Sequence, residues 1–415
     1  MIKNRITILN ILSYIIALML ILNCNTVYSF SYNFTNVQKM IMPIMVVSSI
    51  IYVLMLMKEY KKKIDNILIL GLLVVLYLTF FFLISDFKLI NSIKFIISFI
   101  VIFMLVWVER ENGEISRVLN AYINLILIIA VLSVFFWLLG SILHWITPNK
   151  LVELSWGQYD RLISSYHNIY FETQMSNSVW RNSAVFTEAP MAALNFLLAL
   201  ALSVFFYDNK KNKNMFIIIL IIAGLTTLSV TMYIGIIILF FLKFIEKSSI
   251  NKKANIIKYL LSVVVLPIII ILINKLFNAK LNTQSGADRS LDYINSFLAW
   301  QNSPIFGQGI NAITNGGEKV INGFIIENYG YSSSFTKILG DGGIYLLALI
   351  ILAIVLSLRT SWINKDKSLL FLTIILVYLF MVIAFAQNYL MYYLFIFIAT
   401  YIPCENKRLV IKKSN

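Results

Sequence analysis

Two pairs of charged residues stand beside apolar stretches and together could do chemistry. Arg181 and Glu188 lie in a short segment that leads through Pro190 into a long apolar run, and Arg289 is followed about one helical turn later by Asp292. A guanidinium binds phosphate oxygens through two parallel hydrogen bonds, whereas a partly buried carboxylate can take the proton of a hydroxyl. These residue types therefore suit a site that holds a phosphate and activates a hydroxyl.

The elements that must position these residues are membrane helices. Hydrophobic residues make up 60% of the 415 residues and charged residues only 13%, and many apolar segments reach the ~20 residues needed to cross a bilayer core. Two long polar stretches, 144–190 and 277–337, interrupt this pattern and contain the charged pairs. The composition indicates an integral membrane protein.

We expect an all-α polytopic fold of about twelve transmembrane helices that form one membrane domain over residues 1–415. The expected spans lie near 6–24, 40–57, 66–84, 90–108, 118–143, 191–207, 215–229, 230–245, 259–276, 338–358, 368–385 and 388–403. Only an uncharged break at Ser229–Thr231 separates the seventh span from the eighth. One long helix there would reverse the topology of everything downstream.

The distribution of basic residues fixes the expected topology. With the N-terminus in the cytoplasm, most of the 34 Lys and Arg residues fall in cytoplasmic segments, while acidic residues divide almost evenly between the two sides. This positive-inside pattern predicts cytoplasmic termini and places both polar stretches outside the membrane, as extracytoplasmic loops. The net charge of +15 is therefore a signal of topology, and nucleic acid is not expected as a partner.

Cysteine and histidine offer no metal or disulfide site. In the expected topology Cys24 and Cys404 lie on opposite faces of the membrane, which excludes a disulfide between them, and two Cys with two His do not make a zinc site. The first span lacks a small-residue cleavage pattern after Asn23, so we expect a retained anchor rather than a signal peptide. Abundant Ile, Asn and Lys indicate an AT-rich genome and hence a bacterial host.

The two loops differ in composition. The first interleaves aromatic and polar residues, which is typical of a membrane-interface belt and also of sugar-stacking surfaces, and we favour the belt. Its aromatic residues are Trp156, Tyr159, Tyr166, Tyr170 and Trp180. In the second loop, segment 288–300 carries Leu291, Ile294, Phe297 and Leu298 at a spacing that predicts one apolar face of a short helix. We expect this helix to lie in the membrane interface or to cap the membrane domain.

Four motifs follow one another in these outer stretches. They are Arg181–Pro190 (RNSAVFTEAP), Leu225–Ser229 (LTTLS), Arg289 with Ala299–Gly309 (AWQNSPIFGQG), and Ser332–Gly343 (SSSFTKILGDGG). In this order and on this topology, the chain resembles the O-antigen ligase and polymerase superfamily, in particular the Wzy-type polymerases of surface polysaccharide. The motifs cover residues 181–343, and the topology covers the whole chain.

The resemblance implies a membrane glycosyltransferase of GT-C-like architecture that inverts the anomeric carbon and needs neither a metal nor another cofactor. It implies as substrate an oligosaccharide repeat unit linked through pyrophosphate to a polyprenyl carrier, polymerised on the outer face of the bacterial cytoplasmic membrane. A chain-length regulator and a flippase of the same pathway are the implied partners, besides the lipid bilayer. The absence of a GxxxxGK[ST] motif agrees with a reaction that uses no ATP.

Under this resemblance we expect Arg181 and Arg289 to hold the pyrophosphate and Glu188 to act as the base. Behind Glu188 come Asp292, Glu172 and His167 as alternative bases. We assign the remaining substrate-binding roles to residues in or near the same motifs. These are Arg161, His167, Asp292, Tyr331, Ser332 and Lys337.

Each assignment has a structural alternative. Arg181 could only anchor the interface, and Glu188 could only stabilise the dipole of the helix that Pro190 opens. Arg289 could form an exposed salt bridge with Asp292, which contributes little. For Asp341 we favour a capping role, and for His167 a structural one.

Two departures from the family pattern bear on function. Ser332 and Ser333 stand where ligases of the superfamily carry a histidine followed by an asparagine, which favours a polymerase over a ligase. Val230 stands where an arginine is expected beside Ser229, so Arg161 or Lys337 would have to compensate. The alternatives are a ligase that transfers glycan to a lipid, protein or wall acceptor, and a flippase or other transporter. Nearly charge-free spans and long outer loops disfavour transport.

Overall fold

The computed structural model describes most of the chain. The described residues are 2–60, 66–85, 89–110, 116–156, 160–176, 178–207, 212–246, 267, 271, 274–275, 278, 284–310, 319–321, 324–326, 332–386 and 388–403. Most of them are helical, as composition predicted. Of the expected spans, 259–276 lies mainly outside the described residues, and each of the others coincides with a helix.

The helices have these bounds. They are α1 (Ile2–Leu22), α2 (Val27–Phe30), η1 (Tyr32–Phe34), α3 (Thr35–Tyr60), α4 (Asn66–Ile84), α5 (Leu89–Glu109), α6 (Arg117–Phe136), η2 (Trp137–Ile142), α7 (Ala189–Phe206), α8 (Lys213–Thr226), α9 (Val230–Glu246), α11 (Gln284–Asn302), α12 (Ser334–Asn364), α13 (Lys367–Val382) and α14 (Tyr389–Thr400).

The chain has the helices of a membrane protein. Within the described ranges, six segments are long and apolar enough to cross a bilayer, and further apolar helices such as α13 and α14 are shorter. The six are 32–58, 66–84, 89–109, 117–142, 189–206 and 334–364. The total of twelve spans and the location of the termini remain predictions.

The uncharged break at Ser229 is real. α8 ends at Thr226 and α9 begins at Val230, and between them Leu228 adopts the left-handed backbone conformation, with φ of 48°. A β-branched or long side chain rarely adopts this conformation, and a helix cannot continue through it. The segment is therefore two helices, as the charge pattern required.

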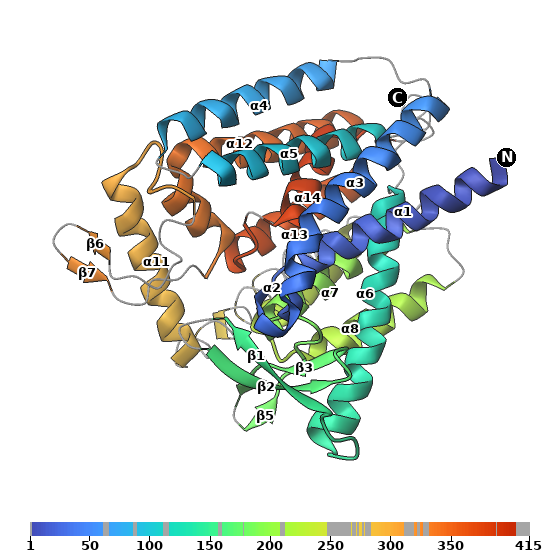
Figure 1. Ribbon diagram of the computed structural model, residues 1–415, viewed down its shortest axis with the longest axis vertical. Helices are drawn as coiled ribbons and strands as arrows, with labels where there is room; N and C mark the ends of the chain where they lie inside the picture. Colours follow the sequence, from blue (N-terminus) through green and yellow to red (C-terminus); the bar gives the residue numbers. More distant parts are fainter. Residues whose placement is uncertain are drawn as a thin grey trace.

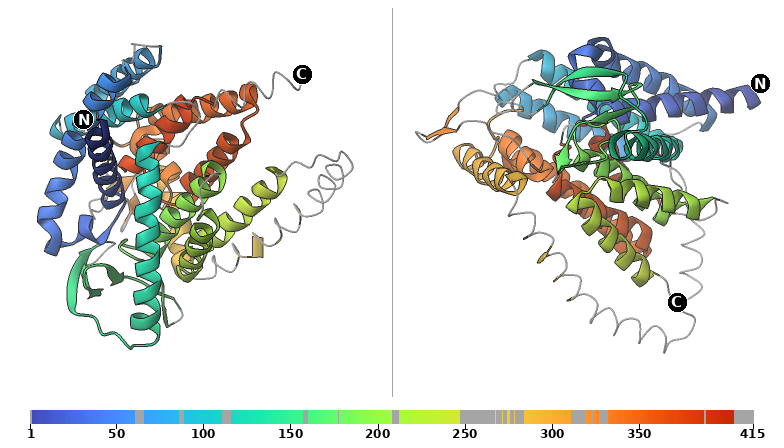
Figure 2. Two further views of the ribbon diagram at one scale, coloured as in Figure 1. Left: turned by 90° about the vertical axis from the view of Figure 1, so that its right-hand side faces the viewer. Right: turned by 90° about the horizontal axis from the view of Figure 1, so that it is seen from below.

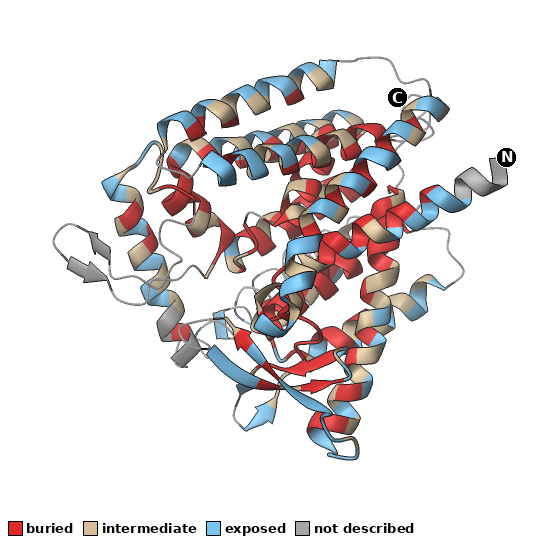
Figure 3. Cartoon of the chain, in the orientation of Figure 1, coloured by how far each residue is buried: buried red, intermediate tan, exposed pale blue. Residues whose placement is uncertain are grey.

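α7 is the centre of the bundle. It packs against α6, α8, α9 and α13, while α12 and α14 join it to a second layer that contains α5 and α3. α4 lies outside this layer, against α5 (Figures 1 and 2). Most side chains of α4 are exposed or half-buried, in contrast to the helices beneath it (Figure 3).

Three small antiparallel sheets, which the sequence did not suggest, lie in the two polar stretches. The first sheet has the order β1 (Lys150–Ser155), β2 (Asp160–Tyr166), β3 (Tyr170–Glu172); the others pair β4 (Met175–Ser176) with β5 (Val179–Trp180) and β6 (Lys319–Ile321) with β7 (Phe324–Ile326). The sheets and α11 lie at the end of the molecule away from the start of α1 (Figure 1). We call this the loop end.

Two tyrosines of the first polar stretch are core residues. Tyr166 and Tyr170 are buried against Phe136, and the Tyr170 hydroxyl accepts a hydrogen bond from Ser141 at 3.1 Å. Neither tyrosine faces lipid or a sugar, so for these two residues both the interface belt and the stacking surface were wrong. Both lie beside the β2–β3 turn, where the end of β2 and all of β3 are buried, and the sequence did not indicate these strands.

Candidate functional site

Arg181 is fixed on two sides. Its Nε donates to the Thr227 carbonyl at 3.0 Å in the α8–α9 turn, and its Nη1 donates to Oε1 of Gln174 at 3.3 Å. The same Gln174 oxygen accepts from the backbone N–H of Ala189 at 3.1 Å. Within the described part of the chain these contacts leave the Nη2 donors of Arg181 available to a ligand. The guanidinium is thus held in place by some of its hydrogen-bond donors, and others remain for a ligand.

Glu188 begins α7 but does not cap it with its side chain. It is the N-cap residue with extended backbone, and its carboxylate makes no capping hydrogen bond, because Gln174 bonds the N–H of Ala189 instead. Pro190 occupies the first turn, where a missing N–H costs nothing. At this position the carboxylate can still stabilise the dipole of α7.

Arg289 projects from the inner face of α11. Its Nη1 donates to the Val382 carbonyl at 3.2 Å, and Tyr293 on the same helix donates to the Met381 carbonyl at 2.9 Å. These bonds satisfy carbonyls at the C-terminal end of α13, where a cation is also favoured by the helix dipole. Arg289 thus has a structural role that the sequence did not suggest.

The other face of α11 is apolar and exposed. Leu291, Ile294 and Phe297 point away from the protein, while Ser296 and Ala299 are fully buried. An amphipathic helix with its apolar side outward is what a membrane interface stabilises. The expected apolar face exists, and it leaves the polar side, with Arg289 and Asp292, turned toward the bundle.

The charges of the two sequence-distant motifs act on one another. Desolvation lowers the pKa of the Arg181 guanidinium; the negative charge of Glu188 opposes this shift, and the positive charge of Arg289 adds to it. Desolvation likewise lowers the pKa of Arg161, and Glu188 opposes it there too. Arg161, Arg181, Glu188 and Arg289 therefore form one electrostatic group, which we call the arginine cluster.

Arg161 reaches this group from the sheet. It lies on β2 opposite Leu154 of β1, near the exposed start of the strand. The sequence offered it as a replacement for the arginine missing at Val230. Its interaction with Glu188 supports that placement, because it adds a third cation to the arginine cluster.

The segment after α1 forms hydrogen bonds with two other loops, and the sequence did not suggest these contacts. The carbonyl of Asn25 accepts from both the N–H and the hydroxyl of Thr187, at 3.0 and 3.1 Å. The Asn25 side chain donates to the carbonyl of Ala384 at 3.3 Å, and Asn23 accepts from the N–H of Tyr389 at 2.8 Å. The segment after α1 thus ties the residues before α7 to the α13–α14 connection.

The sequence does contain a signal for these contacts. Asn23, Asn25 and Thr26 are consecutive polar residues, interrupted only by Cys24, at the end of an apolar helix. Buried polar residues there must find partners, and Asn25 finds its partner in the α13–α14 connection. Cys24 is a buried free thiol whose burial raises its pKa to about 11, and Cys404 lies outside the described residues.

Asp292 and Ser332 meet at the mouth of α12. The Ser332 hydroxyl donates to the Asp292 carboxylate, which joins α11 to the residue before the α12 N-cap. Ser333 is that N-cap, and its hydroxyl accepts from the N–H of Thr336 at 3.2 Å. Asp292 therefore pairs with Ser332, and Arg289 with the Val382 carbonyl of α13.

The glycine motifs bring two backbones together. α12 is interrupted at Gly343, with φ of 60° and ψ of −160°, and the 303–309 segment enters the break. There the N–H of Gly309 donates to the Asp341 carbonyl at 2.9 Å, and the N–H of Ile344 donates to the Pro304 carbonyl at 3.0 Å. A Cβ on Gly343 would lie 2.3 Å from the Ile305 carbonyl oxygen.

These glycines are therefore required by packing rather than by chemistry. A broken helix exposes backbone groups that are unfavourable in lipid unless another segment bonds them. The sequence singled out the motifs 304–309 and 340–343 separately, and in the structure they bond to one another at the break in α12. Asp341 is fully buried within α12 and is not its cap, so the capping role favoured from the sequence is wrong.

The remaining candidates lie elsewhere or outside the described residues. His167 is at the β2–β3 turn, where its N–H donates to Asn149 at 2.7 Å and its ring lies 6.2 Å from that of Phe136. Glu172 is buried and accepts from the Tyr166 hydroxyl at 2.8 Å. Glu172 thus has a structural role, whereas the His167 side chain is exposed.

Lys337 and Tyr331 are the last two substrate-binding residues expected from the sequence. Lys337 is on α12, one turn before Asp341, whose negative charge acts on it. Tyr331 lies outside the described residues. Among the described side chains, no group of three or more His, Cys, Asp and Glu is placed to hold a metal ion.

Comparison of the chain with protein-family models, with curated proteins and with solved structures gave no match.

Proposed function

We propose that this protein polymerises oligosaccharide repeat units linked to a polyprenyl pyrophosphate, on the outer face of a bacterial cytoplasmic membrane. The observation that carries the proposal is the arginine cluster. Arg161, Arg181 and Arg289 come from a strand, a loop and an amphipathic helix, and the charges of all three are linked to one another or to Glu188. The motif resemblance supplies the substrate class, and the membrane helices supply its lipid environment.

Electrostatics favour a multiply charged anion between these side chains. Arg181 and Arg289 carry like charges that raise each other's energy, and desolvation adds to that cost. One carboxylate, Glu188, does not balance three guanidinium groups. A pyrophosphate, which carries several negative charges and accepts bidentate hydrogen bonds from arginine, would relieve the repulsion.

The reaction follows from the placement of the two kinds of charge. The acceptor sugar hydroxyl attacks the anomeric carbon of the donor, its oxygen forms the new glycosidic bond, and the carbon–oxygen bond to pyrophosphate breaks. The hydroxyl proton passes to the Glu188 carboxylate, and polyprenyl pyrophosphate leaves with the bonding electrons. Arg181 and Arg289 stabilise the negative charge that grows on the leaving group.

Glu188 is the preferred base because of where it sits. It is the only carboxylate whose charge acts on both Arg161 and Arg181 in the described residues, and it makes no capping hydrogen bond. Asp292 is paired with Ser332, and Glu172 is bonded to Tyr166 within the sheet. Glu188 therefore lies where an activated hydroxyl and a pyrophosphate would meet.

Lipid-linked repeat units provide the test. Cells that lack this chain should accumulate single repeat units on the polyprenyl carrier, and these can be extracted as substrate. Purified protein in lipid nanodiscs, given that extract in the presence of EDTA, should produce a ladder of longer lipid-linked glycans. A ladder that forms only when a divalent metal is added would overturn the metal-independent chemistry.

The variants must distinguish a loss of catalysis from a failure to fold. Glu188→Gln should abolish the ladder while the protein purifies normally. Glu153→Gln, an exposed carboxylate of β1 outside the arginine cluster, is the matched control and should retain it. Transfer of glycan to a different acceptor, with no ladder, would identify a ligase instead and sink the polymerase proposal.

A further inference from the structure

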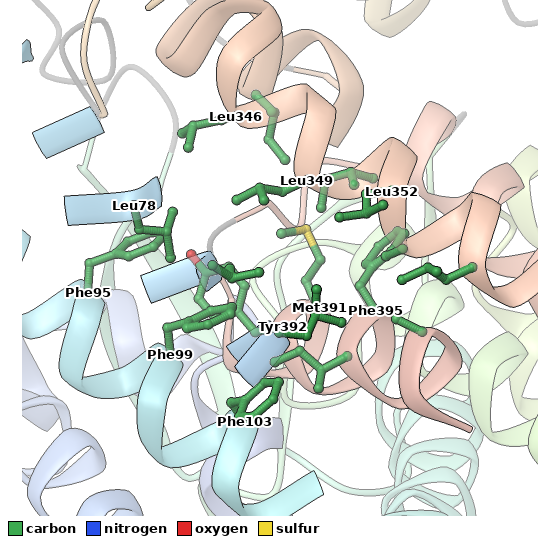
Figure 4. Close-up of a pocket in the computed structure, with 18 of the residues that line it drawn as sticks. Leu78, Phe95, Phe99, Phe103, Leu346, Leu349, Leu352, Met391, Tyr392 and Phe395 are labelled. Atoms are coloured by element: carbon green, nitrogen blue, oxygen red, sulfur yellow. The ribbon is translucent and has the colours of Figure 1, made fainter. Parts of the chain in front are cut away.

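A second feature of the bundle is an apolar cavity between four helices. It has a volume of about 120 Å³ and is lined by side chains of α4, α5, α12 and α14 (Figure 4). Phe95, Phe99 and Phe103 form one wall from α5, and Leu346, Leu349 and Leu352 face them from α12. Such a site suits a hydrocarbon ligand.

Near the loop end, α4 is attached to α12. Tyr77 on α4 and Tyr345 on α12 stack at 3.8 Å between ring centroids, and each hydroxyl donates to the other residue's carbonyl, at 2.8 and 3.1 Å. Further along α4, Leu70 and Val74 line the cavity. Only 17% of the α4 span is buried, so this wall has few contacts to hold it in place.

The residues that line the cavity are spread along much of the length of the surrounding helices. Near the loop end it is bordered by Asp341 and Leu78. At the other extreme it reaches Leu70, about one turn from the start of α4, and Thr400, the last residue of α14. The acyl chain of a phospholipid occupies one leaflet, about 15 Å of the ~30 Å core, so this groove suits a chain that passes the midplane.

Charge also distinguishes the two ends. Asp341 is the one ionisable acidic or basic residue that borders the cavity, and the buried Tyr392 hydroxyl has no hydrogen-bond partner among the described residues. Both are near the loop end, where Lys337 faces Asp341. The rest of the lining is apolar, apart from Thr400 at the far end, and fits an uncharged chain.

One segment of the chain links the cavity to α11, the helix that carries Arg289. Ile310, which follows the segment inserted into the α12 break, lines the cavity, and that segment leads back directly to α11 and Arg289. A lipid with its phosphates among the arginines could therefore extend its chain past Ile310 and Asp341.

We propose that this cavity binds the isoprenoid chain of the polyprenyl carrier while its pyrophosphate occupies the arginine cluster. The inference rests on the proposed function and adds the path of the lipid. A cavity of about 120 Å³ is comparable with the ~150 Å³ apolar cavity that takes one benzene ring, so it admits about one isoprene unit. A longer stretch of chain requires α4 to move outward from α12, which its sparse attachment permits.

Photolabelling tests the location of the chain. The probe is a polyprenyl monophosphate with a diazirine at the ω end of the chain, added to the protein in phosphatidylglycerol nanodiscs. Labelling should fall on cavity side chains far from the loop end, such as Leu70, Phe103 and Leu356. Labels confined to lipid-facing side chains of α4, such as Leu72 and Leu73, would overturn the inference.

A second probe distinguishes the source of the chain. Phosphatidylglycerol with a diazirine at the end of one acyl chain should label the far end of the cavity at least about tenfold less than the isoprenoid probe, a difference of about 1.4 kcal/mol. Equal labelling would identify the cavity as a site for ordinary phospholipid and would reject the isoprenoid assignment.

Two leucines on α12 give a matched pair of variants. Leu356 lines the cavity, whereas Leu358 is exposed and does not. Leu356→Trp should reduce isoprenoid labelling about tenfold, since a filled cavity excludes roughly two methylene groups from apolar contact. Leu358→Trp should leave it unchanged. If Leu356→Trp fails to fold, the label map of the unaltered protein still decides the question.

The two proposals fail separately. Labels inside the cavity without a glycan ladder would reject the polymerase and keep a polyprenyl-binding protein. A ladder in the unaltered protein with labels only outside the cavity would keep the polymerase and reject this path for the chain.

Discussion

α7 and α4 are both long apolar helices, yet they occupy opposite environments. In α7, 94% of the span is buried within the protein; in α4 only 17% is (Figure 3). By hydropathy, α4 is the most hydrophobic of the six candidate spans and α7 the least. In a membrane, high hydropathy therefore marks the helix that meets lipid, and lower hydropathy the helix that meets protein.

Side-chain size and polarity explain the difference. α7 carries small residues that let neighbouring helices approach, and Gly235 of α9 packs directly on its Leu197. It also buries Asn195, whose side chain accepts from the Tyr122 hydroxyl at 2.8 Å and donates to the Met191 carbonyl at 2.9 Å. α7 is thus fixed along its length and holds Glu188 in place, while α4 is a wall that can move.

The largest predicted difference concerns activity at the loop end of α7. Arg181→Ala should lower the rate of glycan polymerisation by about 100-fold to 1,000-fold, the loss typical when one charge-stabilising donor is removed. Arg181→Lys should restore little of it, because an ammonium cannot reproduce the bidentate geometry. Ladder formation in nanodiscs measures both. Full activity of the lysine variant would reduce Arg181 to an interface anchor.

Matched leucine truncations test the packing contrast itself. Leu197→Ala on α7 removes a fully buried side chain and should destabilise the protein by about 2–5 kcal/mol, whereas Leu73→Ala on α4, which is 57% exposed, should cost less than about 0.5 kcal/mol. Thermal unfolding in one detergent compares the two. Similar midpoints for both variants would contradict the assignment of α4 to the lipid boundary.

Two glycines extend the comparison to the backbone. Gly343→Ala places a Cβ 2.3 Å from the Ile305 carbonyl oxygen in a positive-φ conformation, and the conformation alone should cost about 1–3 kcal/mol. At Gly71 on α4 the added Cβ would meet only the Phe103 ring, at 2.3 Å. Since that side chain borders the cavity and can turn, Gly71→Ala should be milder by the same thermal measurement.

The smallest effect concerns the attachment of α4. Tyr77→Phe removes one of the two reciprocal hydrogen bonds to Tyr345 and should destabilise the protein by about 0.5–1.5 kcal/mol. If α4 is the movable wall of the cavity, the variant should also take up the isoprenoid probe at least as well as the unaltered protein. Reduced uptake would show that a fixed α4 shapes the cavity.

Much of the helical framework could be predicted from apolar length and charge alone. The weakest expectation, a break near Ser229, was confirmed, because Leu228 adopts a left-handed conformation there. The strands of the first polar stretch were missed because β1 to β5 are short and several of them do not alternate between exposed and buried residues. The aromatic side chains of Tyr166 and Tyr170 were consequently assigned to the surface when they are buried.

The sequence named candidate residues for the site but did not indicate the contacts that hold them. The types and spacing of Arg181, Glu188 and Arg289 indicated phosphate and hydroxyl chemistry, but nothing local showed that Gln174 would hold both Arg181 and the start of α7. The same applies to Asn25, which lies far from Thr187 in the chain. Partners of this kind depend on contacts between distant segments, and a single sequence carries no record of those contacts.

The sequence by itself determined that this is a membrane protein, where most helices begin and end, and which residues could do chemistry, because hydrophobicity and charge act locally. Only the tertiary structure decided that the charges of the arginine cluster converge, that the 304–309 and 340–343 motifs repair one broken helix, and that α7 is buried while α4 is not. These outcomes depend on packing between distant segments. Within lipid, hydrophobicity alone cannot specify that packing, since lipid and protein interior are equally apolar.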